Sequence, residues 1–340
     1  MRLIEKVWFN QHPAKYWLVP LLLPLTALFY LLSSTRRLAF SLGLLKSVKV
    51  TKPVIVVGNI GVGGNGKTPV VVHLVELSKI LGLKPGVISR GYGGKAETYP
   101  YLLDKNSTSA QAGDEPILIY QRCHVPVVVG ADRVANAQCL IEQGCDIIIS
   151  DDGLQHYRLQ RDFELVIVDG KRLFGNGLLL PAGPLREGTW RLPQADLVIF
   201  NGSKPDHIIE ANDQSLLMTL AATDVINIKT GEQVSLANFI NDQQTINAVA
   251  GIGDPQRFFD TLTTLGFDLA QQQGFVDHKD FTLDDFNQFK TDLPLLMTEK
   301  DAVKCQTFAL GHWWYLPVSA SFCQQDKQTL RQALQVLAKH

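Results

Sequence analysis

The chain of 340 residues has only five cysteines, and no two of them have the Cys-x-x-Cys spacing of a zinc or redox motif. They are Cys123, Cys139, Cys145, Cys305 and Cys323, so any set of pairs leaves one over. This scatter argues against a disulfide framework and against a zinc site, and it favours reduced thiols in the cytosol. We therefore expect the cysteines to behave as small buried apolar residues.

The sequence also lacks an excess of charge of either sign. It has 32 basic and 33 acidic side chains, a net charge of −1, and no basic stripe with interleaved aromatic residues. These features exclude nucleic acid as an expected partner. Apolar residues make up 46% of the chain, enough for a sizeable core, and the length allows two domains or one large domain with an appendage.

The N-terminal part is more apolar than the rest. Tyr16–Leu32 is apolar apart from Thr26 and two prolines, Pro20 and Pro24, with basic residues on both sides. As a helix these seventeen residues would reach only about 25 Å, short of the hydrocarbon thickness. The prolines are expected to break or kink a spanning helix. No small-residue cleavage site follows, which disfavours a signal peptide.

Basic flanks on both sides suit a segment that lies in the interface of an anionic leaflet, with both ends cytoplasmic. A single membrane span, an internal helical hairpin and an oligomer contact remain alternatives at this point. After the basic turn at Arg36 and Arg37, Leu38–Leu45 has the pattern of a further amphipathic helix.

Short apolar runs then alternate with helical patterns. The run Pro53–Val57 is typical of a buried parallel strand, and Val70–Leu81 is periodic as a helix. Further strands are predicted at Gly86–Ile88, Val125–Val129, Asp146–Ile149, Leu165–Val168 and Leu197–Phe200, and further helices at Pro116–Arg122 and Asp132–Glu142. The alternation predicts βαβ units and a doubly wound, mostly parallel sheet of the α/β class.

A hairpin at Val225–Val234, with a Thr230–Gly231 turn, precedes a second alternation of strands and helices. Within that second part we expect strands at Thr245–Ala250, Leu295–Thr298 and Trp313–Val318, and helices at Gln256–Leu265, Leu283–Lys290 and Asp326–Lys339. The predicted organisation is a membrane-associated helical segment (1–45), a P-loop domain (46–222), a hairpin linker (223–238) and a smaller α/β domain (239–340).

The strongest motif is the eight-residue run Gly61-Val62-Gly63-Gly64-Asn65-Gly66-Lys67-Thr68, which matches G-x-x-x-x-G-K-[ST] at every fixed position. A strand is predicted before it and a helix after it, as the motif requires. Glycines let backbone amides turn toward phosphates, and a helix N-terminus adds partial positive charge. Lys67 is expected to reach the β- and γ-phosphates, and the Thr68 hydroxyl to bind Mg²⁺.

Acidic residues lie at the boundaries of two predicted elements, the end of a strand and the start of a helix. Asp151 and Asp152 come directly after a strand, where carboxylates project into the ligand crevice of open α/β sheets. They are expected to hold Mg²⁺, with a helix cap or a turn as the alternative. Asp114 and Glu115 open a helix before a proline, so a cap and a chemical role are equally compatible with the pattern.

Several other polar residues lie near predicted strand ends without a decisive pattern. His278 follows Asp277 in the second domain, and a lone histidine is more often structural. Arg90, Arg133 and Arg186 suit phosphate binding, but surface or ion-pair roles are the more common ones. The turn Thr298–Asp301 is as compatible with a helix cap as with a site.

Taken together, these motifs resemble those of the tetraacyldisaccharide 4′-kinases, the lipid A 4′-kinase family of Gram-negative bacteria. The similarity includes the apolar N-terminal segment and covers nearly the whole chain. The motifs that carry it are Val57-Gly58-Asn59-Ile60, Gly63-Gly64-Asn65-Gly66-Lys67-Thr68-Pro69, Ser89-Arg90-Gly91-Tyr92-Gly93, Gly113-Asp114-Glu115-Pro116, Asp151-Asp152-Gly153-Leu154-Gln155-His156, Leu180-Pro181-Ala182-Gly183-Pro184-Leu185-Arg186-Glu187, Asp277-His278 and Thr298-Glu299-Lys300-Asp301-Ala302.

The resemblance implies ATP-dependent phosphorylation of the 4′-hydroxyl of a tetraacylated glucosamine disaccharide 1-phosphate, with Mg²⁺, at the cytoplasmic face of the bacterial inner membrane. It implies that Asp114 activates the sugar hydroxyl in a dyad with His278. The second domain is then expected to close over the first. The residues implied for Mg²⁺ are Thr68, Asp151, Asp152 and Glu115. Those implied for the substrate or phosphate side are Tyr92, Arg133, Gln155, His156 and Arg186.

Two other functions are compatible with parts of the sequence. The phosphate loop also resembles that of ParA- and MinD-type ATPases, which act on partner proteins at membranes. Those ATPases carry an additional lysine where this chain has Val62, and their membrane helix is usually C-terminal. A soluble kinase of a small metabolite is the other alternative, with the apolar N-terminus as a packing helix.

Overall fold

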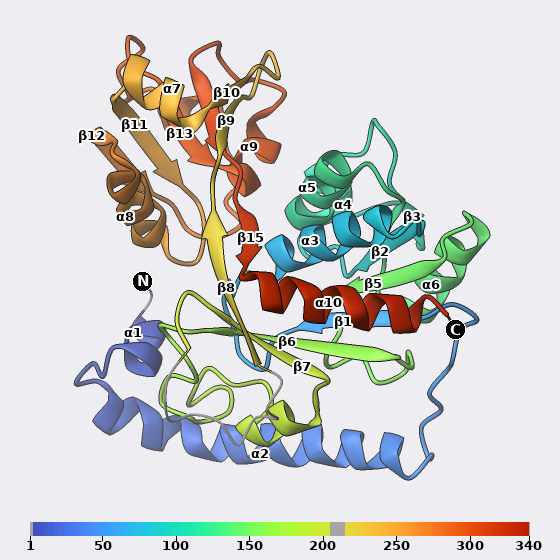
Figure 1. Ribbon diagram of the computed structural model, residues 1–340. Coiled ribbons are helices and arrows are strands. Elements are labelled where there is room, and N and C mark those ends of the chain that lie inside the picture. Colours follow the sequence, from blue (N-terminus) through green and yellow to red (C-terminus); the bar gives the residue numbers. More distant parts are fainter. Residues whose placement is uncertain (1–2, 205–214, 340) are drawn as a thin grey trace.

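The computed structural model describes residues 3–204 and 215–339, and within them the chain forms two α/β domains over a long N-terminal helix (Figure 1). The larger sheet of the described residues has nine strands in the order β15-β8-β7-β6-β1-β5-β2-β4-β3. Their bounds are β15 Ser319–Phe322, β8 Ser215–Ala221, β7 Leu197–Asn201, β6 Phe163–Asp169, β1 Val54–Gly58, β5 Ile147–Asp151, β2 Pro85–Ser89, β4 Val127–Val129 and β3 Tyr101–Leu102.

Helices cover both faces of this sheet, because its central strands are apolar on both sides. In β1, Ile55 and Val57 face one core cluster, whereas Val54 and Val56 face another. The first cluster packs against α3 (Lys67–Ile80), α5 (Asp114–Cys123) and α10 (Gln324–Leu337). The second packs against α6 (Arg133–Glu142) and the 3₁₀ helix η1 (Thr189–Gln194). A short helix, α4 (Ser109–Ala112), precedes α5.

Parallel pairing runs through the strands from β8 to β4, and the edge strands β15 and β3 are antiparallel. The predicted fold class, a doubly wound and mostly parallel sheet with a smaller α/β domain, is therefore confirmed. The carboxyl ends of β1, β2, β5 and β6 lie at one edge, the edge that faces the second domain (Figure 1).

The second domain has a six-stranded sheet among the described residues, in the order β10-β9-β14-β13-β11-β12. Its strands are β10 Gln233–Ser235, β9 Asp224–Asn227, β14 Trp313–Leu316, β13 Leu295–Thr298, β11 Thr245–Ala250 and β12 Asp268–Gly274. Its helices are α7 Leu236–Asp242, α8 Pro255–Leu265, η2 Leu283–Phe286 and α9 Glu299–Cys305.

The structure differs from the predicted domain division at two places. The hairpin expected as a linker is present as β9 and β10, but β9 pairs with β14, so the hairpin is the edge of the second sheet. The end of the chain returns to the first domain: β15 pairs with β8, and Leu330, Leu334 and Leu337 of α10 join its core. The apolar face of α10 packs on the first domain together with β15. The predicted domain 239–340 is therefore not one domain, because its C-terminal end belongs to the first.

The helix expected at Leu283–Lys290 is also wrong, because only the 3₁₀ turn η2 forms there. Phe286 and Phe289 are both buried, three residues apart, and this spacing matches a 3₁₀ turn. A capping box between Thr282 and Asp285 closes its start.

The N-terminal segment forms α1 (Leu3–Phe9) and then one unbroken helix, α2 (Lys15–Ser41), which passes through both prolines and through the expected basic turn. The prediction that the prolines interrupt the helix is wrong. Pro20 and Pro24 are four residues apart on the exposed face, together with Tyr16, so the carbonyl groups left without a donor lie on that face and not in the core. At 27 residues, α2 is about 40 Å long.

Candidate active site

The phosphate loop connects β1 to α3 in the form that the motif requires. Gly66 caps α3 in the left-handed region (φ 90°), and a Cβ there would lie 2.7 Å from the Asn201 amide nitrogen, so only glycine fits. Lys67 opens α3, and its Nζ lies 3.4 Å from Asn59 Oδ1 and 3.7 Å from Asp152 Oδ1. The lysine is thus directed back toward the Asp152 carboxylate, directly after β5.

Asp151 ends β5 and is fully buried beside the phosphate loop. Ser89 Oγ, at the end of β2, lies 3.5 Å from its Oδ2, while its Oδ1 has no hydrogen-bond partner within the described residues. Burial, and next the negative charge of Glu115, raises the pKa of Asp151 above its ordinary value. A buried carboxylate with an unpartnered oxygen suits a bound cation.

Asp152 follows in the left-handed region (φ 47°), a strained conformation for a residue other than glycine. Its oxygens lie 3.1 and 3.0 Å from Arg186 Nη1. Burial acts in the opposite direction, but Lys67 and then Arg186 lower the pKa of Asp152, which stays ionised. Asp151 and Asp152 are therefore adjacent in sequence but electrostatically unlike.

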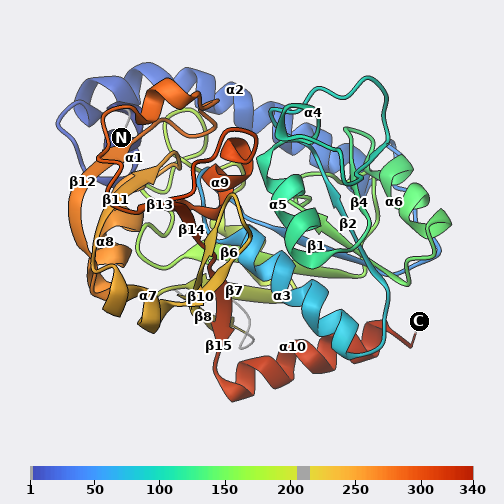
Figure 2. The ribbon, with the colours of Figure 1, turned by 90° about the horizontal axis from the view of Figure 1, so that it is seen from above.

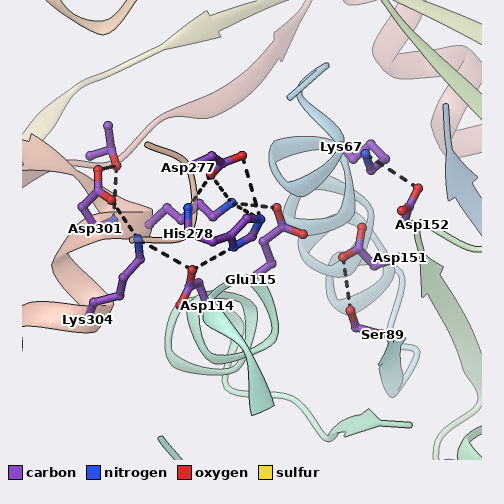
Figure 3. A network of polar contacts seen from close by, with 12 residues as sticks. Lys67, Ser89, Asp114, Glu115, Asp151, Asp152, Asp277, His278, Asp301 and Lys304 are labelled. Atoms are coloured by element: carbon purple, nitrogen blue, oxygen red, sulfur yellow. Dashed lines mark hydrogen bonds and ion pairs between the residues drawn. The ribbon is translucent and has the colours of Figure 1, made fainter. Parts of the chain in front are cut away.

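Asp114 and His278 meet across the two domains (Figure 3). Asp114 is the first residue of α5 and makes no capping hydrogen bond, because Gly113 occupies the cap position. Its Oδ2 lies 3.3 Å from Nδ1 of His278, which belongs to the loop after β12 and has φ 59°. Nε2 of the same imidazole lies 3.5 Å from Lys300 Nζ and 3.8 Å from Asp277 Oδ2.

The comparisons with known proteins agree with one another. A family model described as tetraacyldisaccharide-1-P 4′-kinase matches residues 18–338. The tetraacyldisaccharide 4′-kinase of Colwellia psychrerythraea is 65% identical over 336 residues, which cover 99% of this chain and 98% of that protein. The enzyme of the same name from Vibrio vulnificus is 48% identical over 341 residues, covering 99% and 98%.

The chain belongs to the tetraacyldisaccharide-1-P 4′-kinase family. Among solved structures, the "apo" form of LpxK from Aquifex aeolicus in complex with ATP superposes with a TM-score of 0.80 at 28% identity, covering 94% of this chain and 99% of that one. The resemblance drawn from the sequence motifs is thereby confirmed.

In this member of the 4′-kinase family, the residues predicted for the substrate side contact different parts of the site. The Tyr92 ring lies 5.1 Å from the His278 ring. Arg133 is buried, donates from Nη2 to the Asp151 carbonyl at 2.9 Å, and has its Nη1 unpartnered within the described residues. Gln155 Nε2 donates to the Asn59 carbonyl at 3.2 Å.

His156 is partly buried, and its Nε2 has no hydrogen-bond partner within the described residues. Burial, then the positive charges of Arg133, Arg36 and Arg161, lowers the pKa of His156 to about 4. The imidazole is therefore neutral at physiological pH. Its surroundings are basic, which suits the neighbourhood of a phosphorylated ligand.

Sequence reasoning missed Lys304 of α9 and gave no separate role to Lys300, which lies in the Thr298–Asp301 turn. Lys300 Nζ lies 3.4 Å from Glu115 Oε1 and 3.2 Å from Asp277 Oδ1. Lys304 Nζ lies 3.7 Å from Asp114 Oδ2. The available signal was their spacing of four residues, which places both on one helix face directly after a strand. Thr298 caps α9, so the structure shows the first of the two roles left open by the sequence.

The long N-terminal helix α2 of this 4′-kinase lies along the first domain, on the side away from the second (Figure 1). Thr26 is the residue of α2 that is buried: it donates to the Leu179 carbonyl at 3.4 Å and accepts from Ala182 N at 3.0 Å. Near the C-terminal end of α2, Arg36 donates to the Gln155 carbonyl at 3.2 Å. By length and composition alone, α2 is also the one helix of the described residues that could cross a membrane.

Proposed function

We propose that this protein is an ATP-dependent kinase that phosphorylates the 4′-hydroxyl of a tetraacylated glucosamine disaccharide 1-phosphate. The observation that carries the proposal is the meeting of Asp114 and His278 beside the phosphate loop, 164 residues apart in the chain. A carboxylate and imidazole pair next to a nucleotide-binding loop supplies what an alcohol kinase needs, a group that accepts the hydroxyl proton. Family membership and the ATP complex of the Aquifex relative support it.

At the donor end, the loop Gly61–Thr68 and the N-terminus of α3 would bind the triphosphate of ATP. Lys67 would exchange its contact with Asp152 for the β- and γ-phosphates. Phosphoryl transfer needs positioning and charge stabilisation more than covalent chemistry from the protein. A loop with fixed backbone amides and one lysine meets that need.

The residues present fit a magnesium ion. Within the described residues no three His, Cys, Asp or Glu side chains gather closely enough to hold a metal alone. Mg²⁺ in kinases is usually bound by one or two carboxylates together with phosphate oxygens and water, so a larger cluster is not needed. Asp151, with its unpartnered buried oxygen, and Thr68 would hold it, with Glu115 and Asp152 as further ligands. The ion would neutralise charge on the transferred phosphoryl group.

At the acceptor end, the pair Asp114 and His278 would take the proton of the 4′-hydroxyl as it attacks. Nδ1 of His278 faces Asp114, so the carboxylate orients the ring. Arg133 and Arg186, both next to the strand-end carboxylates, would bind phosphate groups, and Tyr92 would pack against the sugar beside His278.

The acceptor carries four acyl chains, so it stays in the bilayer, and the enzyme has to reach it there. Contacts of α2 with the first domain at Thr26 and Arg36 hold this helix along the protein, which favours a helix lying in the membrane surface over one that spans it. We place the protein at the cytoplasmic face of the inner membrane on these grounds.

The test is to incubate the purified full chain with ATP, Mg²⁺ and the tetraacylated disaccharide 1-phosphate in vesicles or detergent, and to follow products by mass spectrometry. We expect a lipid heavier by one phosphate with wild type and none with Lys67→Ala, which keeps the fold but loses the phosphate contact. ATP hydrolysis without a phosphorylated lipid would instead favour a membrane-docked ATPase.

A further inference from the structure

Lys304 is a buried lysine that links the second domain to the catalytic pair, and no role in the reaction described above requires it. Its side chain is only 4% exposed. Burying an ammonium group is costly unless its partners compensate, and an apolar residue of similar length would fill the space at less cost. The partners of Lys304 are therefore informative.

Three acceptors surround Lys304 Nζ. They are Asp301 Oδ1 at 3.1 Å, the Lys279 carbonyl at 3.2 Å and Asp114 Oδ2 at 3.7 Å. The Phe281 ring packs against the same ammonium, 5.0 Å from its centroid. Figure 3 shows Lys304 between Asp301 on one side and Asp114 on the other.

The first acceptor is a fixed anchor. Asp301 has no exposed surface, and its Oδ2 accepts from Gly251 N at 2.8 Å and from Thr298 Oγ1 at 2.6 Å. A Cβ on residue 251 would lie 2.8 Å from Asp301 Oδ1, so glycine is needed for this approach. The carboxylate is thus held by the ends of β11 and β13, and it holds Lys304 in turn.

The other two acceptors are Asp114 itself and the backbone next to His278. Lys279 directly follows His278, whose left-handed backbone needs support from its surroundings to persist. Asp114 belongs to the first domain, and its Oδ2 is the same oxygen that faces His278 Nδ1. One ammonium group therefore contacts the loop of the histidine and the carboxylate that orients it.

Resting on the kinase function above, we propose that Lys304 is a positioning residue for phosphoryl transfer. It sets the Asp114 carboxylate and the His278 loop in one arrangement, anchored by Asp301. Because Lys304 and Asp114 lie in different domains, the pair is in working geometry only while the second domain lies on the first. Lys304 touches no reacting atom, and acts through Asp114.

The experiment compares full-length Lys304→Met, Lys304→Arg, Asp114→Asn and the double variant Asp114→Asn with Lys304→Met. Lys290→Met, an exposed lysine of the same domain without a side-chain contact to the site, is the matched control. Initial rates on the lipid acceptor give kcat and the KM for ATP, and thermal unfolding checks that each variant is folded.

We expect Lys304→Met to lower kcat about 10- to 100-fold, because displacing a catalytic group by about 1 Å has an effect of this size. The KM for ATP should change less than about threefold, Lys304→Arg should recover part of the loss, and Lys290→Met should behave as wild type. In the Asp114→Asn background the Met substitution should have little further effect, since residues acting as a unit are not additive.

A wild-type kcat in Lys304→Met, or a loss that multiplies fully with that of Asp114→Asn, overturns the inference while leaving the kinase function intact. If Lys304→Met does not fold, the Arg variant and its combination with Asp114→Asn decide in the same way. Absence of a phosphorylated lipid with wild type would overturn the proposed function, and this inference with it.

Discussion

Strain marks two residues of the site, Asp152 and His278, which both have a positive φ although neither is glycine. Such conformations cost about 1 to 3 kcal/mol each and persist only where neighbouring contacts determine them. Asp152 is held by Arg186 and Lys67, and His278 by Asp114 and by the loop that Lys304 contacts. The strained backbone is thus found at two residues whose side chains are held in one direction by their contacts.

The first prediction concerns Asp114 and His278, the pair proposed to accept the hydroxyl proton. Asp114→Asn should lower kcat on the lipid acceptor by about 100-fold or more, because general base catalysis contributes about that much. The KM for ATP should stay near the wild-type value, since Asp114 contacts no part of the phosphate loop. His278→Ala should have the same effect in a milder form. A kcat within a few-fold of wild type in Asp114→Asn would refute the assignment of this pair.

The second prediction concerns His156, whose pKa is lowered to about 4 by burial and by nearby arginines. In the unfolded chain the pKa of histidine is near 6.5. Between these two values the unfolded state binds the extra proton and the folded state does not, so stability falls as pH decreases from about 6.5 toward 4. His156→Gln cannot bind that proton.

Denaturant unfolding of both proteins at pH 7 and pH 5 measures this difference. The free energy of unfolding should drop less between the two pH values in His156→Gln than in wild type. The His156 resonances should also show no titration between pH 7.5 and 5.5 in proton NMR. Equal pH dependence in the two proteins would contradict the assigned neutral imidazole.

Among the elements, α2 shows most clearly what its sequence could and could not reveal. Its apolar character and basic flanks are local, and they predicted a membrane-associated segment. Its continuity through Pro20 and Pro24 was not predictable, because it depends on which face of the helix meets the first domain, and that face carries the buried Thr26.

The same division applies to the site. Strand, loop and helix around Lys67, and the carboxylates after β5, follow from neighbouring residues and were predicted from them. The contacts of His278 and Lys304 with Asp114 depend on how two domains meet, and no local pattern encodes this. The return of β15 and α10 to the first domain was also missed. The partner of β15, the edge strand β8, is distant in sequence, and no pattern within β15 identifies it.

The third prediction follows from four leucines of α2. Leu21, Leu25, Leu28 and Leu32 are spaced as one helix face and are 52 to 66% exposed. Replacing Leu25 and Leu28 by Gln should weaken binding to anionic vesicles about tenfold or more, because each leucine contributes about 1.5 kcal/mol or more when buried in an apolar phase. Vesicle flotation measures this directly.

Val336→Gln on α10 is the matched control, since Val336 is 58% exposed. The double Leu variant keeps Thr26 and Arg36, so the contacts of α2 with the first domain remain, which deletion of residues 1–35 would not allow. Its activity on acceptor dissolved in detergent should stay close to wild type. Unchanged flotation would show that this face does not lie in the membrane.

Across the whole molecule, ion pairs at two separate places hold the second domain on the first. On one side, α5 packs against α9, as Figure 2 shows from above, and Arg122 Nη1 contacts Glu299 Oε2 at 2.8 Å. On the other side, Arg257 Nη1 contacts Asp169 Oδ2 at 2.6 Å, and Arg172 Nη2 contacts Asp254 Oδ2 at 2.7 Å. In each of these pairs one residue belongs to the first domain and the other to the second.

The fourth prediction is that Arg257→Gln shifts the two domains toward a more open arrangement. Asp169, which is 2% exposed, would lose its cation at the end of β6. Small-angle X-ray scattering should give a larger radius of gyration than for wild type or for Arg331→Gln, an exposed arginine of α10. Because Asp114 and His278 meet only when the domains are together, kcat should fall as well, and saturating ATP should restore part of the closed form. An unchanged radius of gyration with unchanged kcat would mean that the α5 and α9 contact alone keeps the domains closed.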